Sequence, residues 1–242
     1  MVYNLITSSV SKREKLLALL LDPDKCPDSK LDYLIKIIDK RPPHFILVGG
    51  SLISRPIEPL VRRLKQCLDI PIVLYPGHPA HIRPEFDALL LLSMISGRNP
   101  ELLIGNHVVA APLIKQYGIE AIATGYMLID GGVQTSVEYI SNTRPIPADK
   151  TDIIISTAMA GEMLGFKLIY MDAGSGAVRP IPQKTIEEVK ANCSIPLMVG
   201  GGINTPEKLK IAFNHGADIV VIGNAVEKTP ELLNDFLDVA GR

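Results

Sequence analysis

Three glycine-rich segments in the last third of the chain are the residues most able to do chemistry. Each follows a short apolar run: Tyr170–Gly176 (YMDAGSG), Gly200–Ile203 (GGGI), and the pair Gly223-Asn224. Glycine lets the main chain come close to a ligand and adopt φ angles that a Cβ forbids. Backbone N–H groups that converge just before a helix bind anions well. The three segments therefore predict a site for a phosphate group.

Tyr170 and Asp172 add a phenol and a carboxylate to the first of these segments. Residues two apart on a strand point to the same side, so both side chains share a face and Met171 lies opposite. Such a pair can bind or deprotonate a substrate hydroxyl. The alternative for Tyr170 is a buried structural hydrogen bond to a carboxylate.

Asp22 and Ser51 follow apolar runs near the start of the chain, in the segments DPDK and GGS. Mg²⁺ is commonly held by one or two carboxylates, with phosphate oxygens and waters completing its octahedron. Asp22 is the first polar residue beyond its run and is the better candidate for a metal beside a diphosphate. A cap or turn accounts for Asp24, and it is also the alternative for Asp22 and for Ser51. His78 and His81 lack a third nitrogen or sulfur ligand and do not have the spacing of a zinc site.

Eight short apolar runs must position these groups, and longer amphipathic stretches separate most of them. Runs of this length bounded by Gly, Pro or Asp are typical of strands buried on both faces. Eight of them alternating with helices predict a single α/β domain over residues 1–242, a parallel (β/α)8 TIM barrel. The predicted strands are Leu16–Leu21, Phe45–Val48, Ile72–Tyr75, Ala88–Leu92, Ala121–Leu128, Lys167–Met171, Leu197–Val199 and Ile219–Ile222.

Two connections depart from the regular pattern. Residues 76–87 (PGHPAHIRPEFD) contain three prolines and are too short for a barrel helix with its two loops. We predict a modified barrel whose third helix is missing or replaced by an extended segment. The connection over residues 129–149 is long, which predicts an extra short helix near the mouth of the site. Elsewhere we expect helices over 29–40, after Pro56, from Pro100 to Lys115, and after Thr205.

Composition narrows the function classes. The formal charge is −1 and only 5% of residues are aromatic, with no Trp, so neither a basic field nor base stacking favours a nucleic-acid partner. Three widely spaced cysteines favour a reducing compartment, which predicts a cytoplasmic protein. No apolar run reaches the ~18 residues of a membrane span.

Several longer motifs together resemble the geranylgeranylglyceryl phosphate synthase family, and specifically its group II branch. The resemblance runs almost end to end. It rests on LLLDPDK, FILVGGS, PIVLYPGHPAHI, LLLLSMISGRNPELLIGNHVVAAP, IATGYMLIDGG, YMDAGSGA, VGGGI and VIGNAVE. It implies a modified barrel without a regular third helix and a homo-oligomer. It also implies Mg²⁺-dependent transfer of a geranylgeranyl group from its diphosphate to the 3-hydroxyl of sn-glycerol 1-phosphate.

The resemblance also assigns roles to single residues. Asp22 and Ser51 match the positions that hold Mg²⁺. In the reaction that the resemblance implies, we expect Tyr170 and Asp172 to orient the acceptor hydroxyl and Asp172 to accept its proton. The positions matching the glycerol-phosphate site are Tyr170, Met171, Asp172, Ala173, Gly174, Ser175, Gly176, Gly201, Gly202, Gly223 and Asn224. The wider family often has glutamate where this chain has Asp172, and the other branch has lysine where it has Leu20. The leucine-rich fourth strand is expected to shelter the prenyl tail of geranylgeranyl diphosphate or another polyprenyl diphosphate.

Two other function classes remain open from the residues alone. A phosphate-binding barrel isomerase or lyase uses the same glycine loops but needs an acid–base pair. A non-catalytic subunit that binds phosphate or lipid is the second. A flavin enzyme is also compatible with the glycine loops, and the colour of the purified protein tests for it.

Overall fold

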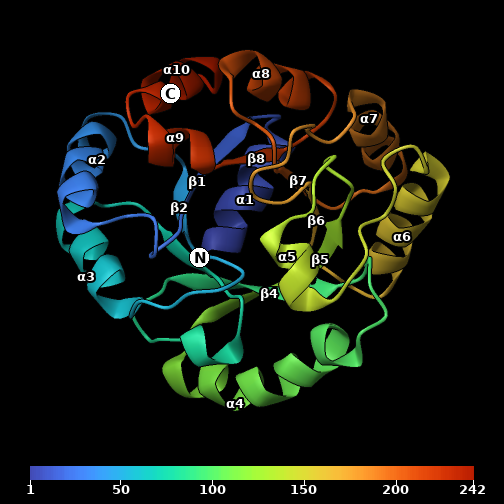
Figure 1. Cartoon of the computed structure of the whole chain (residues 1–242), viewed down its shortest axis with the longest axis horizontal. Coiled ribbons are helices and arrows are strands. Elements are labelled where there is room, and N and C mark those ends of the chain that lie inside the picture. Colours follow the sequence, from blue (N-terminus) through green and yellow to red (C-terminus); the bar gives the residue numbers. More distant parts are fainter.

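The computed structural model describes residues 1–242, and its strands close into a parallel barrel in the order β1 to β8 (Figure 1). The first and last strands pair with each other. The strands are β1 Leu16–Leu21, β2 Phe45–Gly49, β3 Ile72–Tyr75, β4 Ala88–Met94, β5 Glu120–Leu128, β6 Leu168–Asp172, β7 Leu197–Gly200 and β8 Ile219–Ile222. The eight predicted strands are confirmed, with ends that differ by two residues at most.

Apolar side chains line both faces of the barrel wall. Leu16 and Ala18 belong to a cluster of 18 buried residues inside the barrel. Their neighbours Leu17, Leu19 and Leu21 belong to a cluster of 49 between the barrel and its helices. Because successive strand residues point to opposite faces, a wall buried on both sides requires uninterrupted apolar runs.

Helices form a ring around this barrel (Figure 1). They are α2 Asp28–Lys40, α3 Glu58–Cys67, α4 Asn106–Tyr117, α6 Thr151–Met163, α7 Gln183–Asn192, α8 Pro206–Asn214 and α10 Leu232–Val239. The short helix α9 (Asn224–Lys228) lies between α10 and the barrel (Figure 1). The predicted start of α8 is confirmed: the Thr205 side chain accepts a hydrogen bond from the Lys208 N–H, and Pro206 occupies the first turn.

A further helix, α1 (Val2–Ser11), closes the amino-terminal end of the barrel. The carboxylate of Glu120, at the start of β5, accepts hydrogen bonds from the N–H groups of Val2 and Tyr3. The buried side chains of Val2 and Ile6 join the cluster inside the barrel. This end is therefore sealed, and the opposite end carries the open cavities.

The irregular connections have distinct structures. Between β3 and β4 the chain forms one 3₁₀ turn, Pro79–His81, and no α-helix. The segment after β5 contains the short helix α5 (Ser136–Ser141), capped by Thr135, so that prediction is confirmed. In Figure 1, α5 lies over the barrel rather than in the outer ring.

The helix predicted from Pro100 to Lys115 is not one regular α-helix. Residues Glu101–Gly105 form a π-helical turn, and α4 begins only at Asn106. Pro112 lies inside α4, where it has no N–H to donate to the preceding turn. Sequence periodicity alone did not separate these two parts.

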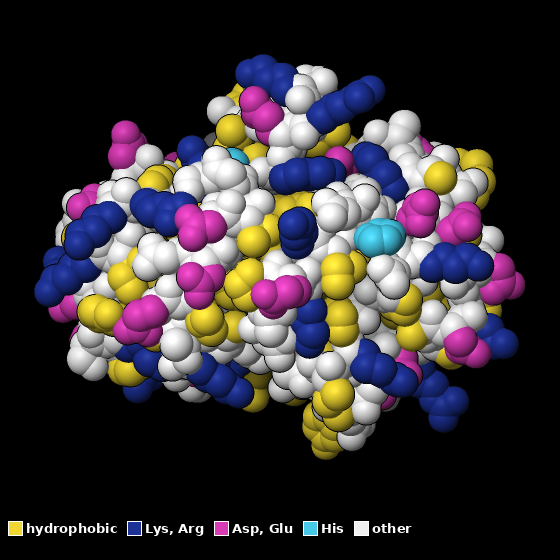
Figure 2. Space-filling model, turned by 90° about the horizontal axis from the view of Figure 1, so that it is seen from above, with side chains coloured by type: hydrophobic (Ala, Val, Ile, Leu, Met, Phe, Trp, Pro, Cys, Tyr) yellow, Lys and Arg dark blue, Asp and Glu magenta, His cyan; other side chains and the backbone are white.

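Charged side chains of both signs intermingle on the face of the molecule shown in Figure 2, with small groups of apolar atoms between them. This distribution matches the formal net charge of −1. None of the helices combines the length and the apolar character that a bilayer crossing requires.

Candidate active site

The loops that follow the strands at their carboxyl ends enclose a polar cavity of about 580 Å³. It is lined by segments that follow β1, β2, β6, β7 and β8, together with α5. Of the predicted site residues, those lining it are Asp22, Ser51, Tyr170, Asp172, Gly174, Ser175, Gly176, Gly201, Gly202, Gly223 and Asn224. The barrel thus brings residues from both ends of the chain into one cavity.

Met171 and Ala173 do not line this cavity. Met171 is fully buried among the side chains outside the barrel wall, because strand alternation turns it away from its neighbours Tyr170 and Asp172. Ala173 is buried as well, and its N–H donates to the carbonyl of Gly200. The side chains of Met171 and Ala173 are therefore not available to a ligand in the cavity.

Left-handed glycines shape the loops after β6 and β7. Gly174 and Gly176 have φ of +86° and +84°, and Gly201 and Gly202 have φ of +80° and +70°. A Cβ on Gly201 would lie 2.6 Å from the backbone nitrogen of Ala173. At Gly201, both the φ angle and the close packing of the two loops therefore require glycine.

Asp172 lies at the inner wall of the cavity and is only 7% exposed. Its Oδ2 accepts a hydrogen bond from the Tyr126 hydroxyl at 2.7 Å, and its Oδ1 accepts one from the Gly174 N–H at 2.8 Å. Burial raises the pKa of Asp172, and these two hydrogen bonds act in the opposite direction. A carboxylate in such surroundings is a better proton acceptor than one in water.

Three tyrosines surround this carboxylate. The rings of Tyr126 and Tyr170 are nearly perpendicular, with centroids 5.4 Å apart, and the Tyr75 ring lies 6.5 Å and 6.0 Å from them. Burial, together with the charge of Asp172, raises the pKa of all three phenols, so they stay protonated as hydrogen-bond donors. Of these groups, the Asp172 carboxylate is therefore better suited than the Tyr170 phenol to accept a proton.

Sequence reasoning gave no role to Tyr75 and Tyr126, although both lie in motifs that carry the family resemblance. The pairing of strands β5 and β6 shows why Tyr126 belongs to the site. Tyr126 pairs directly with Tyr170, and Leu128 pairs with Asp172. Once β5 and β6 are aligned, Tyr126 must face the barrel interior one layer below the carboxylate.

Asp22 ends β1 on the opposite part of the rim. Its Oδ1 accepts from the Asp24 N–H at 3.0 Å, and its Oδ2 lies 3.0 Å from the Lys25 ammonium. The β2 loop is adjacent, since a Cβ on Gly50 would lie 3.5 Å from Asp22 Oδ2. Asp24 instead accepts hydrogen bonds from the backbone of residues 54 and 55, which supports its interpretation as a turn residue.

The Asp22 carboxylate and the Ser51 hydroxyl fit a magnesium ion that is shared with a ligand better than they fit a closed metal site. The structure contains no group of three or more His, Cys, Asp or Glu side chains that could hold a metal by themselves. One carboxylate and one hydroxyl leave most of an octahedron to phosphate and water, which is the usual arrangement for Mg²⁺. His78 is not part of a metal pair: its Nδ1 accepts from the Ala80 N–H, and its ring centroid lies 6.3 Å from that of His81.

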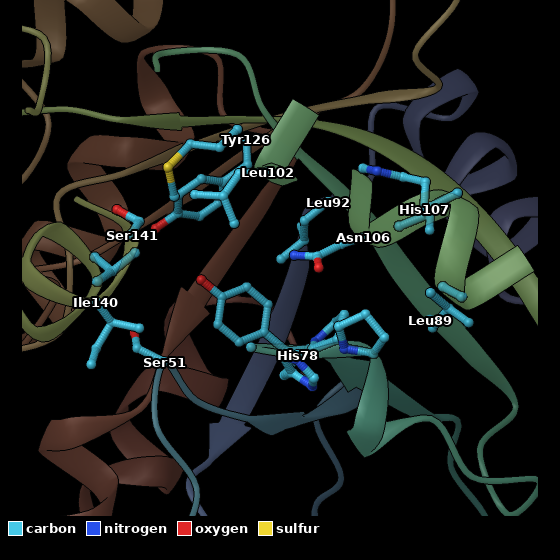
Figure 3. Close-up of a pocket in the computed structure, with 18 of the residues that line it drawn as sticks. Ser51, His78, Leu89, Leu92, Leu102, Asn106, His107, Tyr126, Ile140 and Ser141 are labelled. Carbon is cyan, nitrogen blue, oxygen red and sulfur yellow. The ribbon is translucent and has the colours of Figure 1, made fainter. Parts of the chain in front are cut away.

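A second, mainly apolar cavity adjoins the first (Figure 3). Its volume is about 130 Å³. β4, the π-helical turn and α5 supply most of its apolar walls. Its apolar lining includes Ile82, Leu89, Leu91, Leu92, Met94, Leu102, Ala110, Val137 and Ile140.

The polar side chains of this second cavity are few. Figure 3 shows Asn106 and His107 on α4 and His78 after β3 among the apolar residues. His107 Nε2 lies 3.0 Å from the Ser93 hydroxyl, which also donates to the Leu103 carbonyl. These contacts attach α4 to β4 beside the cavity.

The two cavities meet near the barrel axis. Gly50, Ser51, Tyr75 and Val137 line both of them. A ligand with an anionic end and a long apolar end can therefore span the junction, with the Tyr75 ring beside the point where its character changes.

Comparisons with known proteins show which family the chain resembles. The model of the PcrB family matches residues 9–240. A geranylgeranylglyceryl phosphate synthase from Chitinophaga pinensis is 49% identical over 238 residues, covering 98% of this chain and 94% of that protein. A protein of the same name from Thermococcus kodakarensis is 37% identical over 219 residues, covering 90% of this chain and 86% of that one.

A solved structure is similar over the whole barrel. It is the (S)-3-O-geranylgeranylglyceryl phosphate synthase from Thermoplasma acidophilum in complex with its substrate sn-glycerol-1-phosphate. The TM-score is 0.93 at 28% identity, covering 99% of this chain and 98% of that one.

Proposed function

The chain belongs to the PcrB family, and from this premise we propose that it transfers a geranylgeranyl group from its diphosphate to the 3-hydroxyl of sn-glycerol 1-phosphate. The products are geranylgeranylglyceryl phosphate and diphosphate. One observation carries the proposal: a polar cavity with anion-binding loops meets an apolar cavity beside a buried carboxylate. Such a site suits a small phosphate and a lipid chain, and the names and coverage of the relatives support the same reaction.

The glycerol phosphate is proposed to bind in the polar cavity against the loops after β6, β7 and β8. Gly201, Gly202 and Gly223 expose backbone there without a side chain in the way. Phosphate commonly binds at this position in (β/α)8 barrels, between the loops after the last two strands. A phosphate fixed there leaves the far hydroxyl of glycerol free to reach towards the barrel axis.

Asp172 is proposed to accept the proton of that hydroxyl. The hydroxyl oxygen forms a bond to the first carbon of the prenyl chain as the bond from that carbon to the diphosphate oxygen breaks. The proton moves to the carboxylate of Asp172, whose raised pKa suits it to this role. The protonated phenols of Tyr126 and Tyr170 hold the carboxylate and the acceptor in place.

Asp22 and Ser51 are proposed to hold a magnesium ion on the diphosphate side of the cavity. When bound, Mg²⁺ offsets the negative charge that builds up on the leaving diphosphate. The Lys25 ammonium, 3.0 Å from Asp22 Oδ2, adds a second positive charge at the same rim.

The prenyl chain is proposed to extend into the apolar cavity along β4. Leu89, Leu91 and Leu92 are in position to contact it, and burying its carbons there is favourable by about 0.8 kcal/mol for each CH₂ group. Other polyprenyl diphosphates differ only in this part, so the cavity rather than the polar loops selects the donor.

We further propose a cytoplasmic homo-oligomer. All three cysteines are free, as a reducing compartment favours. On α4 and the π-helical turn, Ile104, Val108 and Val109 are each at least 60% exposed, which favours contact with another copy of the chain.

A product assay tests the reaction. The purified protein with Mg²⁺ is offered sn-glycerol 1-phosphate or its 3-phosphate enantiomer, together with prenyl diphosphates of several lengths. We expect an ether lipid from sn-glycerol 1-phosphate and geranylgeranyl diphosphate. If the folded protein gives no lipid with any donor, the proposed function is wrong.

A further inference from the structure

Glu227 on α9 is a buried carboxylate in the wall of the polar cavity, and only 6% of it is exposed. A negative charge at this position repels the phosphate groups of both proposed ligands. The presence of a carboxylate here therefore calls for an explanation. Sequence reasoning did not single it out, because it lies in the short helix after the Gly223-Asn224 loop. Its contacts lead to both halves of the site.

The first carboxylate oxygen of Glu227 holds the end of β1. Its Oε1 accepts a hydrogen bond from the Asp22 N–H at 3.0 Å. This bond fixes the backbone of the residue that faces the diphosphate side. The Lys25 ammonium, which pairs with Asp22 at 3.0 Å, also lies 4.0 Å from Glu227 Oε2.

The second oxygen of Glu227 faces the glycine loops. With the Asn224 amide in the orientation that satisfies both its ends, the amide nitrogen donates to Glu227 Oε2 at 3.3 Å. The amide oxygen of Asn224 then accepts from the Gly176 N–H at 3.0 Å. A continuous chain of hydrogen bonds thus runs from Asp22 through Glu227 and Asn224 to the loop after β6.

We propose that Glu227 is a positioning residue that sets the metal–diphosphate half and the glycerol-phosphate half of the site relative to each other. This inference rests on the proposed function and adds a residue to it. Both carboxylate oxygens already accept hydrogen bonds from the protein, so Glu227 acts through Asp22 and Asn224 rather than on a metal ion or substrate. Truncating it frees both neighbours at once.

Two substitutions test the two ends of this series of hydrogen bonds separately. Glu227→Ala removes both acceptors, and hydrogen bonds to a charged group are strong enough that we expect about a 10- to 100-fold effect. We expect this variant to raise both the KM for sn-glycerol 1-phosphate and the Mg²⁺ concentration that gives half-maximal activity.

Glu227→Gln keeps one acceptor and turns the other into a donor. Its amide oxygen must face the Asp22 N–H, so its NH₂ group meets the amide nitrogen of Asn224, which then rotates away from Gly176. We expect the KM for sn-glycerol 1-phosphate to rise about 10-fold while the Mg²⁺ requirement stays near that of the wild type. A residue that only stabilises the fold would not separate these two quantities.

The matched control is Glu231→Gln, an exposed glutamate nearby that accepts a hydrogen bond from the Tyr33 hydroxyl. We expect it to leave both quantities unchanged. Thermal unfolding of each variant gives the folded fraction. Unchanged KM and Mg²⁺ requirement in both Glu227 variants, with or without loss of stability, overturns the inference. A wild-type protein that makes no lipid defeats the proposed function instead, so the two failures are distinguishable.

Discussion

The Tyr126→Phe substitution tests whether Asp172 accepts the proton. It removes one hydroxyl and keeps the ring that packs against Tyr170 with centroids 5.4 Å apart. The lost bond is the one from the phenol to Asp172 Oδ2, 2.7 Å long and buried. This bond lowers the pKa of Asp172 against the effect of burial, so its loss must raise that pKa further.

The size of the effect follows from the strength of the bond. A hydrogen bond to a charged group contributes about 1.5–3 kcal/mol, and each pH unit corresponds to about 1.4 kcal/mol. If Asp172 must be ionised to act, activity falls on the acid side of the pH profile. We therefore expect the acid limb in the variant to lie about 1 to 2 pH units higher than in the wild type.

The assay is kcat/KM for sn-glycerol 1-phosphate measured across pH at saturating prenyl diphosphate. Tyr33→Phe is the control, because it removes an exposed hydroxyl that donates a hydrogen bond to Glu231, away from Asp172. The control is expected to retain the wild-type profile. An acid limb that stays in place in a folded Tyr126→Phe protein would refute Asp172 as the titrating base.

Three further predictions concern separate parts of the molecule. Asp22→Asn keeps the side-chain volume but removes the charge; we expect kcat/KM to fall at least about 100-fold and the Mg²⁺ requirement to rise, as metal titration of activity will measure. Gly201→Ala places a Cβ 2.6 Å from the Ala173 nitrogen, so we expect a higher KM for sn-glycerol 1-phosphate; Gly165→Ala, with φ of +89° but nothing within 4 Å, should cost stability alone. Burial lowers the pKa of His44 to about 4, below its unfolded value, so its contribution to stability is complete above about pH 6.5 and is lost as the pH falls towards 4. Allowing for partial exposure, we expect the free energy of unfolding to drop by about 2 kcal/mol over that window. We expect most of this drop to be absent in His44→Gln, as denaturant titration at several pH values will measure.

Much of the fold was predictable because the barrel wall is buried on both faces. That burial demands apolar runs, and the runs mark the strands directly, as at Leu16–Leu21 and Ile219–Ile222. The glycine loops were also recognisable, since left-handed φ angles at Gly201 and Gly202 leave few other residues possible. Local sequence rules sufficed wherever the constraint itself was local.

The rest depended on contacts between distant segments. Tyr126 became a site residue only through its alignment with Tyr170 across β5 and β6. Glu227 meets Asp22 from 205 residues away along the chain. The π-helical turn at Glu101–Gly105 was likewise hidden, because its apolar residues fit a regular helix equally well. None of these could be derived from spacing along one segment.

The aromatic wall at the junction of the two cavities has a consequence for the fidelity of the reaction. Water can attack the allylic carbon of a prenyl diphosphate in place of the glycerol hydroxyl, and this side reaction releases a prenyl alcohol. The Tyr126 and Tyr170 side chains are each only 2% exposed, and Tyr75 stands between the wet cavity and the apolar one. The rings exclude water from the side of Asp172 that they cover. They therefore influence how much of the donor becomes ether lipid and how much becomes prenyl alcohol.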